Sequence, residues 1–209
     1  MVRRYYGKSS FATKENPFRS EGFLHDGAIF RTGGGTLALS ILPPFLRTLL
    51  VTDGTVTKIL EAYFWEPISV DTLRQEVVTT EQAVPWIDVN PKTDVLVRQA
   101  RLRGIHSDNV YATAFSVIRP ERIAASFRQR LIDREIGIGV LIRDSGLESY
   151  RELMEVGIEP RRPIPAAEKL HLEDRIFRTY RIIIGEAPVI LITESFPLSC
   201  YADTLRDQS

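Results

Sequence analysis

The chain has 209 residues, of which 44% are hydrophobic and 26% charged, a composition typical of a globular protein and unlike disordered or collagen-like chains. Its 27 Lys and Arg residues balance 27 Asp and Glu residues, so the formal net charge is zero. This balance argues against a broad electrostatic interface for nucleic acid or for an anionic membrane. We expect a loosely ordered N-terminal extension over residues 1–35 and a single domain over residues 36–209.

Cysteine usage restricts the chemistry further. The only cysteine, Cys200, can form neither an internal disulfide nor a cysteine cluster for a metal, which favours a reducing compartment. No apolar run approaches the ~20 residues that cross a bilayer, and the first residues are not followed by a signal-peptide core. The sequence therefore predicts a cytoplasmic protein with no metal, nucleic-acid or membrane partner, present as a monomer or small homo-oligomer.

Helices are predicted from apolar spacing and from the turn residues that bound it. Gly33 to Gly35 close the N-terminal stretch and are interpreted as a hinge, because no Lys-Ser/Thr follows them to complete a phosphate-binding loop. Apolar residues at helical spacing then predict five helices. The first follows Pro43-Pro44 and ends near Asp53, and the others cover residues 55–63, 119–131, 145–156 and 166–172.

Strands are predicted where residues are β-branched or alternate between apolar and polar. They cover residues 68–78, 94–104, 110–118, 177–184 and 188–196. Only a few residues connect the second strand to the third and the fourth to the fifth, and connections this short join antiparallel neighbours. Strands clustered with helices inserted among them indicate an α+β fold with helices packed against a mainly antiparallel sheet.

Two of these strands carry a charge where an apolar residue is expected. Arg98 shares a strand face with Leu96 and Ala100, and Glu194 shares one with Ile192 and Phe196. A buried charge is costly unless it is paired and hydrogen-bonded. The two residues therefore form an internal salt bridge, escape to an edge of the sheet, or line a polar pocket that holds a ligand carboxylate and hydroxyl. Strand geometry alone leaves these alternatives open.

Glycines flank Ile138 in the segment Gly137-Ile138-Gly139. Glycine on both sides allows the backbone to approach another group closely and leaves the Ile138 N–H available. The alternative is a turn that leads into a helix or strand.

Several short motifs, taken in their order along the chain, resemble the chorismate pyruvate-lyase family, including its 4-hydroxybenzoate-forming and uncharacterised branch from bacteria and archaea. The motifs are residues 49–58, 97–98, 136–139, 151–153, 177–181 and 192–197, with residues 151–153 on a predicted helix. The resemblance implies a six-stranded antiparallel sheet with helices packed on it. It also implies conversion of chorismate, a small anionic substrate, to 4-hydroxybenzoate and pyruvate without a metal or organic cofactor.

The resemblance further implies a set of site residues. Arg98 matches the arginine that binds the ring carboxylate, and Ile138, beside Gly139, matches the residue whose backbone N–H assists it. Glu194 matches the carboxylate that contacts the 4-hydroxyl, which makes Arg98 and Glu194 the predicted catalytic residues. Val56 falls where some members have a pocket-lining methionine.

A second cation is needed for the enolpyruvyl carboxylate, and Arg178 and Arg181 are the candidates. They lie on opposite faces of one predicted strand, so at most one of them points into the pocket.

Other functions are weighed against this one. A Ser/His/Asp hydrolase lacks a Gly-x-Ser-x-Gly turn, and a zinc site lacks paired His or Cys spacing. A non-catalytic binder of an aromatic or cyclic carboxylic acid stays open, as does a related enzyme for another chorismate-like or polyketide-like acid. Gly137 stands where proline is usual in the family, and Val56 replaces methionine, which leaves room for a shifted substrate.

Overall fold

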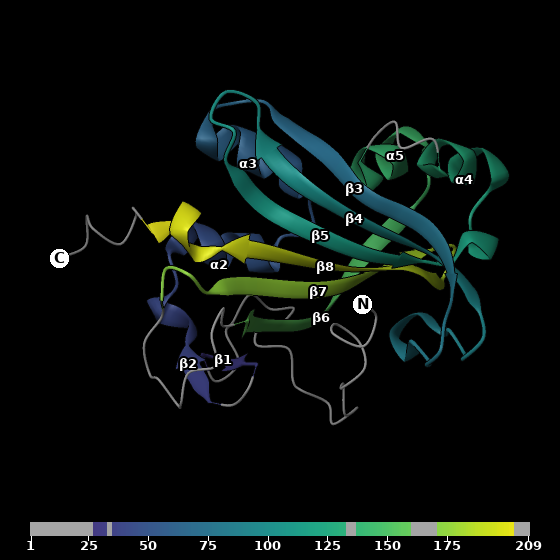
Figure 1. Cartoon of the computed structure of the whole chain (residues 1–209), viewed down its shortest axis with the longest axis horizontal. Helices are drawn as coiled ribbons and strands as arrows, with labels where there is room; N and C mark the ends of the chain where they lie inside the picture. Colours follow the sequence, from purple (N-terminus) through teal and green to yellow (C-terminus); the bar gives the residue numbers. More distant parts are fainter. Residues whose placement is uncertain (1–26, 33–34, 133–136, 160–170, 203–209) are drawn as a thin grey trace.

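A computed structural model describes residues 27–32, 35–132, 137–159 and 171–202. These residues build one eight-stranded sheet with the order β2-β1-β6-β7-β8-β5-β4-β3 (Figure 1). The strands are β1 (Ala28–Arg31), β2 (Thr36–Ala38), β3 (Ile68–Thr79), β4 (Asp94–Gly104), β5 (Val110–Ile118), β6 (Ser149–Glu159), β7 (Arg175–Ile184) and β8 (Ala187–Pro197). The six long strands β3 to β8 pair antiparallel with one another, whereas β1 runs parallel to β6. The predicted α+β fold with a mainly antiparallel sheet is confirmed.

Four α-helices accompany the sheet in the described part of the chain. They are α2 (Pro44–Val51), α3 (Val56–Phe64), α4 (Ala125–Ile132) and α5 (Ile138–Asp144). The first three agree with predicted helices, whereas α5 follows the Gly137 turn and is not predicted by apolar spacing. The predicted helix over residues 166–172 lies almost entirely outside the described residues. No helix among the described residues is long and apolar enough to cross a membrane.

The prediction of a helix over residues 145–156 is wrong, because most of this segment belongs to β6. A β-bulge between Leu153 and Glu155 interrupts the two-residue alternation of this strand. Apolar residues on one sheet face, Leu153 and Val156, are therefore three positions apart, as they would be on a helix. Pairing with β7 along the whole of β6 overrides the helical propensity of its Arg, Glu, Leu and Met residues.

The N-terminal part of the described chain joins the sheet. β1 lies inside the predicted extension and pairs with β2 and β6, so the sheet includes residues on both sides of the boundary predicted at residue 36. Residues 1–26 of that extension, and Gly33 and Gly34 of the predicted hinge, lie outside the described residues.

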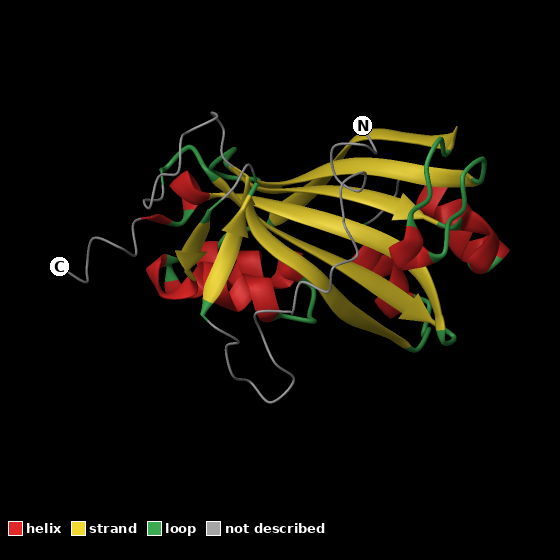
Figure 2. Cartoon of the chain, turned by 90° about the horizontal axis from the view of Figure 1, so that it is seen from below, coloured by secondary structure: helices red, strands yellow, loops and turns green. Residues whose placement is uncertain are grey.

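Two groups of helices pack on different parts of the sheet. Figure 1 shows α2 and α3 near one end of the long strands and α4 and α5 near the other end. Leu46 and Leu60 of the first group pack into a cluster with Leu102 and Phe196 of the strands. A second cluster joins α4 and α5 to the strands, and its members include Phe127, Leu141, Leu96, Ile118 and Ile190. In Figure 2 the long strands fan out and twist, with helices at both ends.

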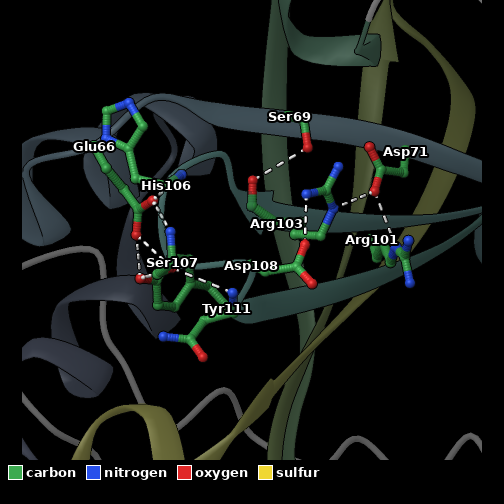
Figure 3. A network of polar contacts seen from close by, with 10 residues as sticks. Glu66, Ser69, Asp71, Arg101, Arg103, His106, Ser107, Asp108 and Tyr111 are labelled. Carbon is green, nitrogen blue, oxygen red and sulfur yellow. Dashed lines mark hydrogen bonds and ion pairs between the residues drawn. The ribbon is translucent and has the colours of Figure 1, made fainter.

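A carboxylate holds the β4–β5 turn against the start of β3 (Figure 3). Glu66 accepts hydrogen bonds from the backbone N–H groups of His106 (2.9 Å) and Ser107 (3.0 Å) and from the Ser107 (2.7 Å) and Tyr111 (2.5 Å) hydroxyls. The Tyr111 hydroxyl makes the largest contribution, and together these bonds lower the pKa of Glu66 to about 2. The turn is thereby fixed to the α3–β3 junction.

A second carboxylate ties β3 to β4 further along the same strands. Asp71 accepts hydrogen bonds from Nε of Arg103 at 2.8 Å and from Nε of Arg101 at 3.0 Å. The Arg103 guanidinium is the main cause of the lowered pKa of Asp71, about 2. These contacts secure the register of the strand that carries Arg98.

Candidate functional site

Polar side chains lie between the two apolar clusters, on the sheet face that both helix groups cover. Directly paired residues share a face, so the register places Arg98 of β4, Ser116 of β5 and Tyr180 of β7 in one row across the sheet. Glu194 of β8 and Arg178 of β7 occupy the adjacent row. Each of these side chains is at least 93% buried, with Glu194 7% exposed and Arg178 1% exposed.

A cavity of about 80 Å³ opens over these rows. Its walls include the start of α5 and the loop that leads into α3. The lining contains five of the predicted site residues, Val56, Arg98, Ile138, Gly139 and Glu194, together with Arg151, Ser116 and Tyr180, which were not predicted as site residues. Residues from six strands and two helices thus line one cavity.

Glu194 is paired with an arginine from the neighbouring strand. Nε of Arg178 donates to Oε2 of Glu194 at 2.8 Å. Nη1 of Arg178 donates to the carbonyl oxygens of Leu49 and Thr52, each at 2.6 Å. Burial is the largest single effect and disfavours the charged guanidinium, but the charge of Glu194, Tyr180 and the hydrogen bonds of both together raise the pKa of Arg178. Among the described residues, the ion pair of Glu194 is therefore made with Arg178 instead of Arg98.

Tyr180 holds the other oxygen of the same carboxylate. Its hydroxyl donates to Oε1 of Glu194 at 3.2 Å, and its ring lies 4.9 Å from the guanidinium carbon of Arg178. Burial is the largest cause of the raised pKa of Tyr180, and the charge of Glu194 adds to it. The phenol stays protonated at neutral pH, so it serves Glu194 as a hydrogen-bond donor.

Arg98 lies in the predicted position, between apolar neighbours on an inward strand face. Its side chain is 3% exposed, and Nη2 donates to Oγ1 of Thr72 at 2.8 Å. Thr72 comes from β3 and pairs with Ala100 in the strand register. This bond orients the guanidinium along the wall of the cavity.

Arg151 is a cationic residue of the cavity that sequence reasoning missed. It extends from β6, and Nη1 donates to the carbonyl oxygen of Asp53 at 2.6 Å. Nε is buried and has no hydrogen-bond partner among the described residues. A methyl group at Gly139 would lie 3.3 Å from Cγ2 of Thr55 and 3.8 Å from Nη2 of Arg151, so glycine permits the close approach of α5.

Arg178 and Arg181, the two candidates for a second cation, both lie outside the cavity lining. Arg178 is behind Glu194 and is absent from the cavity lining. Arg181 lies on the opposite sheet face, where Nε donates to Glu152 at 2.7 Å and Nη1 donates to the carbonyl oxygen of Trp86 at 3.0 Å. The strand alternation thus places the two side chains on different faces, as predicted.

The residues that the sequence reasoning missed gave only weak signals. Ser116 lies among Ala112 and Ala114, and small side chains opposite a buried arginine leave space for a ligand. Tyr180 and Arg151 fall inside the motifs that resemble the family, but Tyr180 resembles a core aromatic residue and Arg151 falls in a segment predicted as a helix. No group of three His, Cys, Asp or Glu side chains that would suit a metal ion occurs within the described residues.

An α+β protein whose antiparallel sheet carries a cavity lined by two arginines is of the kind that binds small anions. The family model described as "Chorismate pyruvate-lyase Rv2949c-like" matches residues 50–203 of the chain. The chain therefore belongs to this family of chorismate pyruvate-lyases.

Individual relatives agree with the family match. A chorismate pyruvate-lyase of Mycobacterium leprae is 30% identical over 166 residues, which cover 78% of this chain and 79% of that protein. The chorismate pyruvate-lyase of Mycobacterium tuberculosis is 25% identical over 180 residues, covering 78% of this chain and 84% of its own length. The solved structure of PhnF from Mycobacterium smegmatis shares the fold, with a TM-score of 0.51 and 11% identity over 70% of this chain and 65% of that chain.

Proposed function

We propose that the protein eliminates pyruvate from chorismate to give 4-hydroxybenzoate. The family supports lyase chemistry on chorismate. The observation that carries the proposal for this chain is the buried Glu194, which is held on both oxygens and lines a cavity that also contains Arg98. The cavity therefore offers a fixed carboxylate and a fixed guanidinium to a ligand that carries both a hydroxyl and a carboxylate.

The reaction is balanced without a co-reactant. The bond between ring carbon C3 and the ether oxygen breaks, C4 loses its proton, and the ring becomes aromatic. The ether oxygen departs with the three-carbon fragment, and protonation of the methylene carbon of that fragment completes pyruvate. Because aromatisation already favours the products, the protein has mainly to orient the substrate and to move one proton.

Arg98 and Glu194 have different roles in this proposal. Arg98, assisted by the Ile138 N–H, binds the ring carboxylate through its planar fork of donors. Glu194 binds the 4-hydroxyl and accepts the C4 proton or positions it for transfer to the methylene carbon. Tyr180 and Arg178 act as positioning residues, because each donates a hydrogen bond to Glu194 and thereby orients its carboxylate.

The test is to incubate the purified protein with chorismate, without added metal, and to follow 4-hydroxybenzoate and pyruvate together. We expect equimolar products, and a turnover number that falls more than substrate affinity does in Glu194→Gln. Arg98→Lys keeps the charge but loses the fork, so we expect kcat/KM to fall by about 10- to 100-fold. Products that form no faster than in the spontaneous reaction, while 4-hydroxybenzoate still binds, would establish a non-catalytic binder instead.

A further inference from the structure

The charges of the cavity suit a ligand with two negative charges. Arg98, Arg151 and Glu194 are the charged side chains of its lining. Arg178, which lies behind the lining, already forms the ion pair with Glu194. Three guanidinium groups against one carboxylate leave an excess of two positive charges around the cavity.

The two lining arginines reach the cavity from different sides. Arg98 extends from β4 and Arg151 from β6, and β5, β8 and β7 lie between these strands. Four steps between neighbouring strands separate the two backbones by about 19 Å along the sheet. The two arginines therefore enter the cavity from well-separated strands.

Arg151 has the geometry of a carboxylate receptor. The backbone carbonyl oxygen of Asp53 accepts a hydrogen bond from Nη1 of Arg151, which holds the guanidinium in place. The opposite edge carries Nε and Nη2, the pair of donors that binds a carboxylate through two parallel hydrogen bonds. Nε is buried and has no partner among the described residues, an arrangement that is costly unless a ligand completes it.

We propose that Arg151 forms a second carboxylate subsite, which binds the enolpyruvyl carboxylate of the substrate while Arg98 binds the ring carboxylate. This inference rests on the proposed function, because chorismate supplies the two carboxylates. The product 4-hydroxybenzoate has only the ring carboxylate, so the subsite distinguishes substrate from product.

The test compares one ligand that has two carboxylates with one that has a single carboxylate. In Arg151→Gln we expect the KM for chorismate to rise by about 10- to 100-fold, the range for a lost hydrogen bond to a charged group. The Kd of 4-hydroxybenzoate, measured by calorimetry, should stay unchanged. The matched control is Arg143→Gln, which removes an exposed arginine of α5 that pairs with Asp144 and should alter neither value.

The outcomes separate this inference from the proposed function. If Arg151→Gln weakens the binding of both ligands equally, Arg151 only holds the Asp53 loop in place and the subsite is overturned. An unchanged KM for chorismate would also overturn the subsite. If the wild-type protein releases no product, the proposed function fails, and calorimetry with chorismate in place of KM still tests the subsite. If Arg151→Gln does not fold, Arg151→Lys replaces it, and its loss of affinity must again be confined to chorismate.

Discussion

Replacement of Arg178 by methionine should destabilise the protein strongly. Arg178 is 1% exposed and makes three hydrogen bonds, one to Glu194 and two to the carbonyl oxygens of Leu49 and Thr52. Methionine fills much of the same space but supplies no donor. Glu194 would then keep only the bond from Tyr180, and a carboxylate that is 7% exposed would be left without its cation.

The size of this destabilisation follows from the buried groups that lose their hydrogen-bond or ion-pair partner. Removing one member of a buried ion pair costs about 3–5 kcal/mol. Each carbonyl oxygen that loses its donor adds about 1 kcal/mol, although such terms overlap in a single network. We therefore expect the free energy of unfolding to fall by about 5 kcal/mol, which for a domain of this size lowers Tm by about 10–20 °C.

Thermal and urea unfolding of four proteins test this reasoning. They are the wild type, Arg178→Met, Glu194→Gln and the double variant, measured at neutral pH. In the double variant both charges of the Arg178–Glu194 pair are absent and Tyr180 still has an acceptor, so we expect the deficit to shrink to about 2 kcal/mol, the value of the two carbonyl oxygens. A double variant as unstable as the sum of the single ones would refute the assignment of the loss to the stranded carboxylate.

Two further predictions concern the β4–β5 turn. Because the folded pKa of Glu66 is about 2 against an ordinary 4.5, its stabilisation is complete above about pH 4.5 and is lost as the pH falls toward 2. The Tm difference between wild type and Glu66→Gln should therefore be present at pH 7 and shrink steadily below pH 4.5; a constant difference contradicts the network in Figure 3. A methyl group at Gly104 would lie 2.6 Å from Oε2 of Glu66, so Gly104→Ala should cost about 1–3 kcal/mol in urea unfolding. Most of this cost should vanish in a Glu66→Ala background. If the cost is the same whatever residue stands at position 66, its cause lies in the Gly104 backbone and not in contact with Glu66.

The alternation of residues along the strands predicts the positions of Arg98 and Glu194 well. Both belong to long, regular strands with clear turn signals, and each lies buried on the face that the two-residue period assigns to it. Their partners are harder to predict. Which arginine meets Glu194 depends on the order β7-β8-β5-β4, which places β7 next to β8 and leaves β4 two strands away. Strand order is a long-range property that local periodicity does not contain.

Arg151 shows the opposite case, in which a local irregularity hides a site residue. The bulge after Leu153 gives β6 the apolar spacing of a helix, and a helical Arg151 would have no defined relation to the sheet. Only the pairing of Arg151 with Ile182 places its side chain on the face that carries Tyr180 and Glu194. The sequence motif therefore marks this segment without revealing its geometry.

Arg151 in the cavity lining and Arg178 behind it also position the loop that borders the cavity. Arg178 holds the carbonyl oxygens of Leu49 and Thr52, and Arg151 holds that of Asp53. The chain continues directly into Val56, which lines the cavity. Because α2 ends at this point and its last carbonyl groups need donors, two strand arginines satisfy the end of the helix and fix the cavity wall at once. Ligand affinity and stability should therefore be coupled in variants of Arg178, which holds both Glu194 and the end of α2. They should be separable in variants of Arg98, which donates to Thr72 within the sheet.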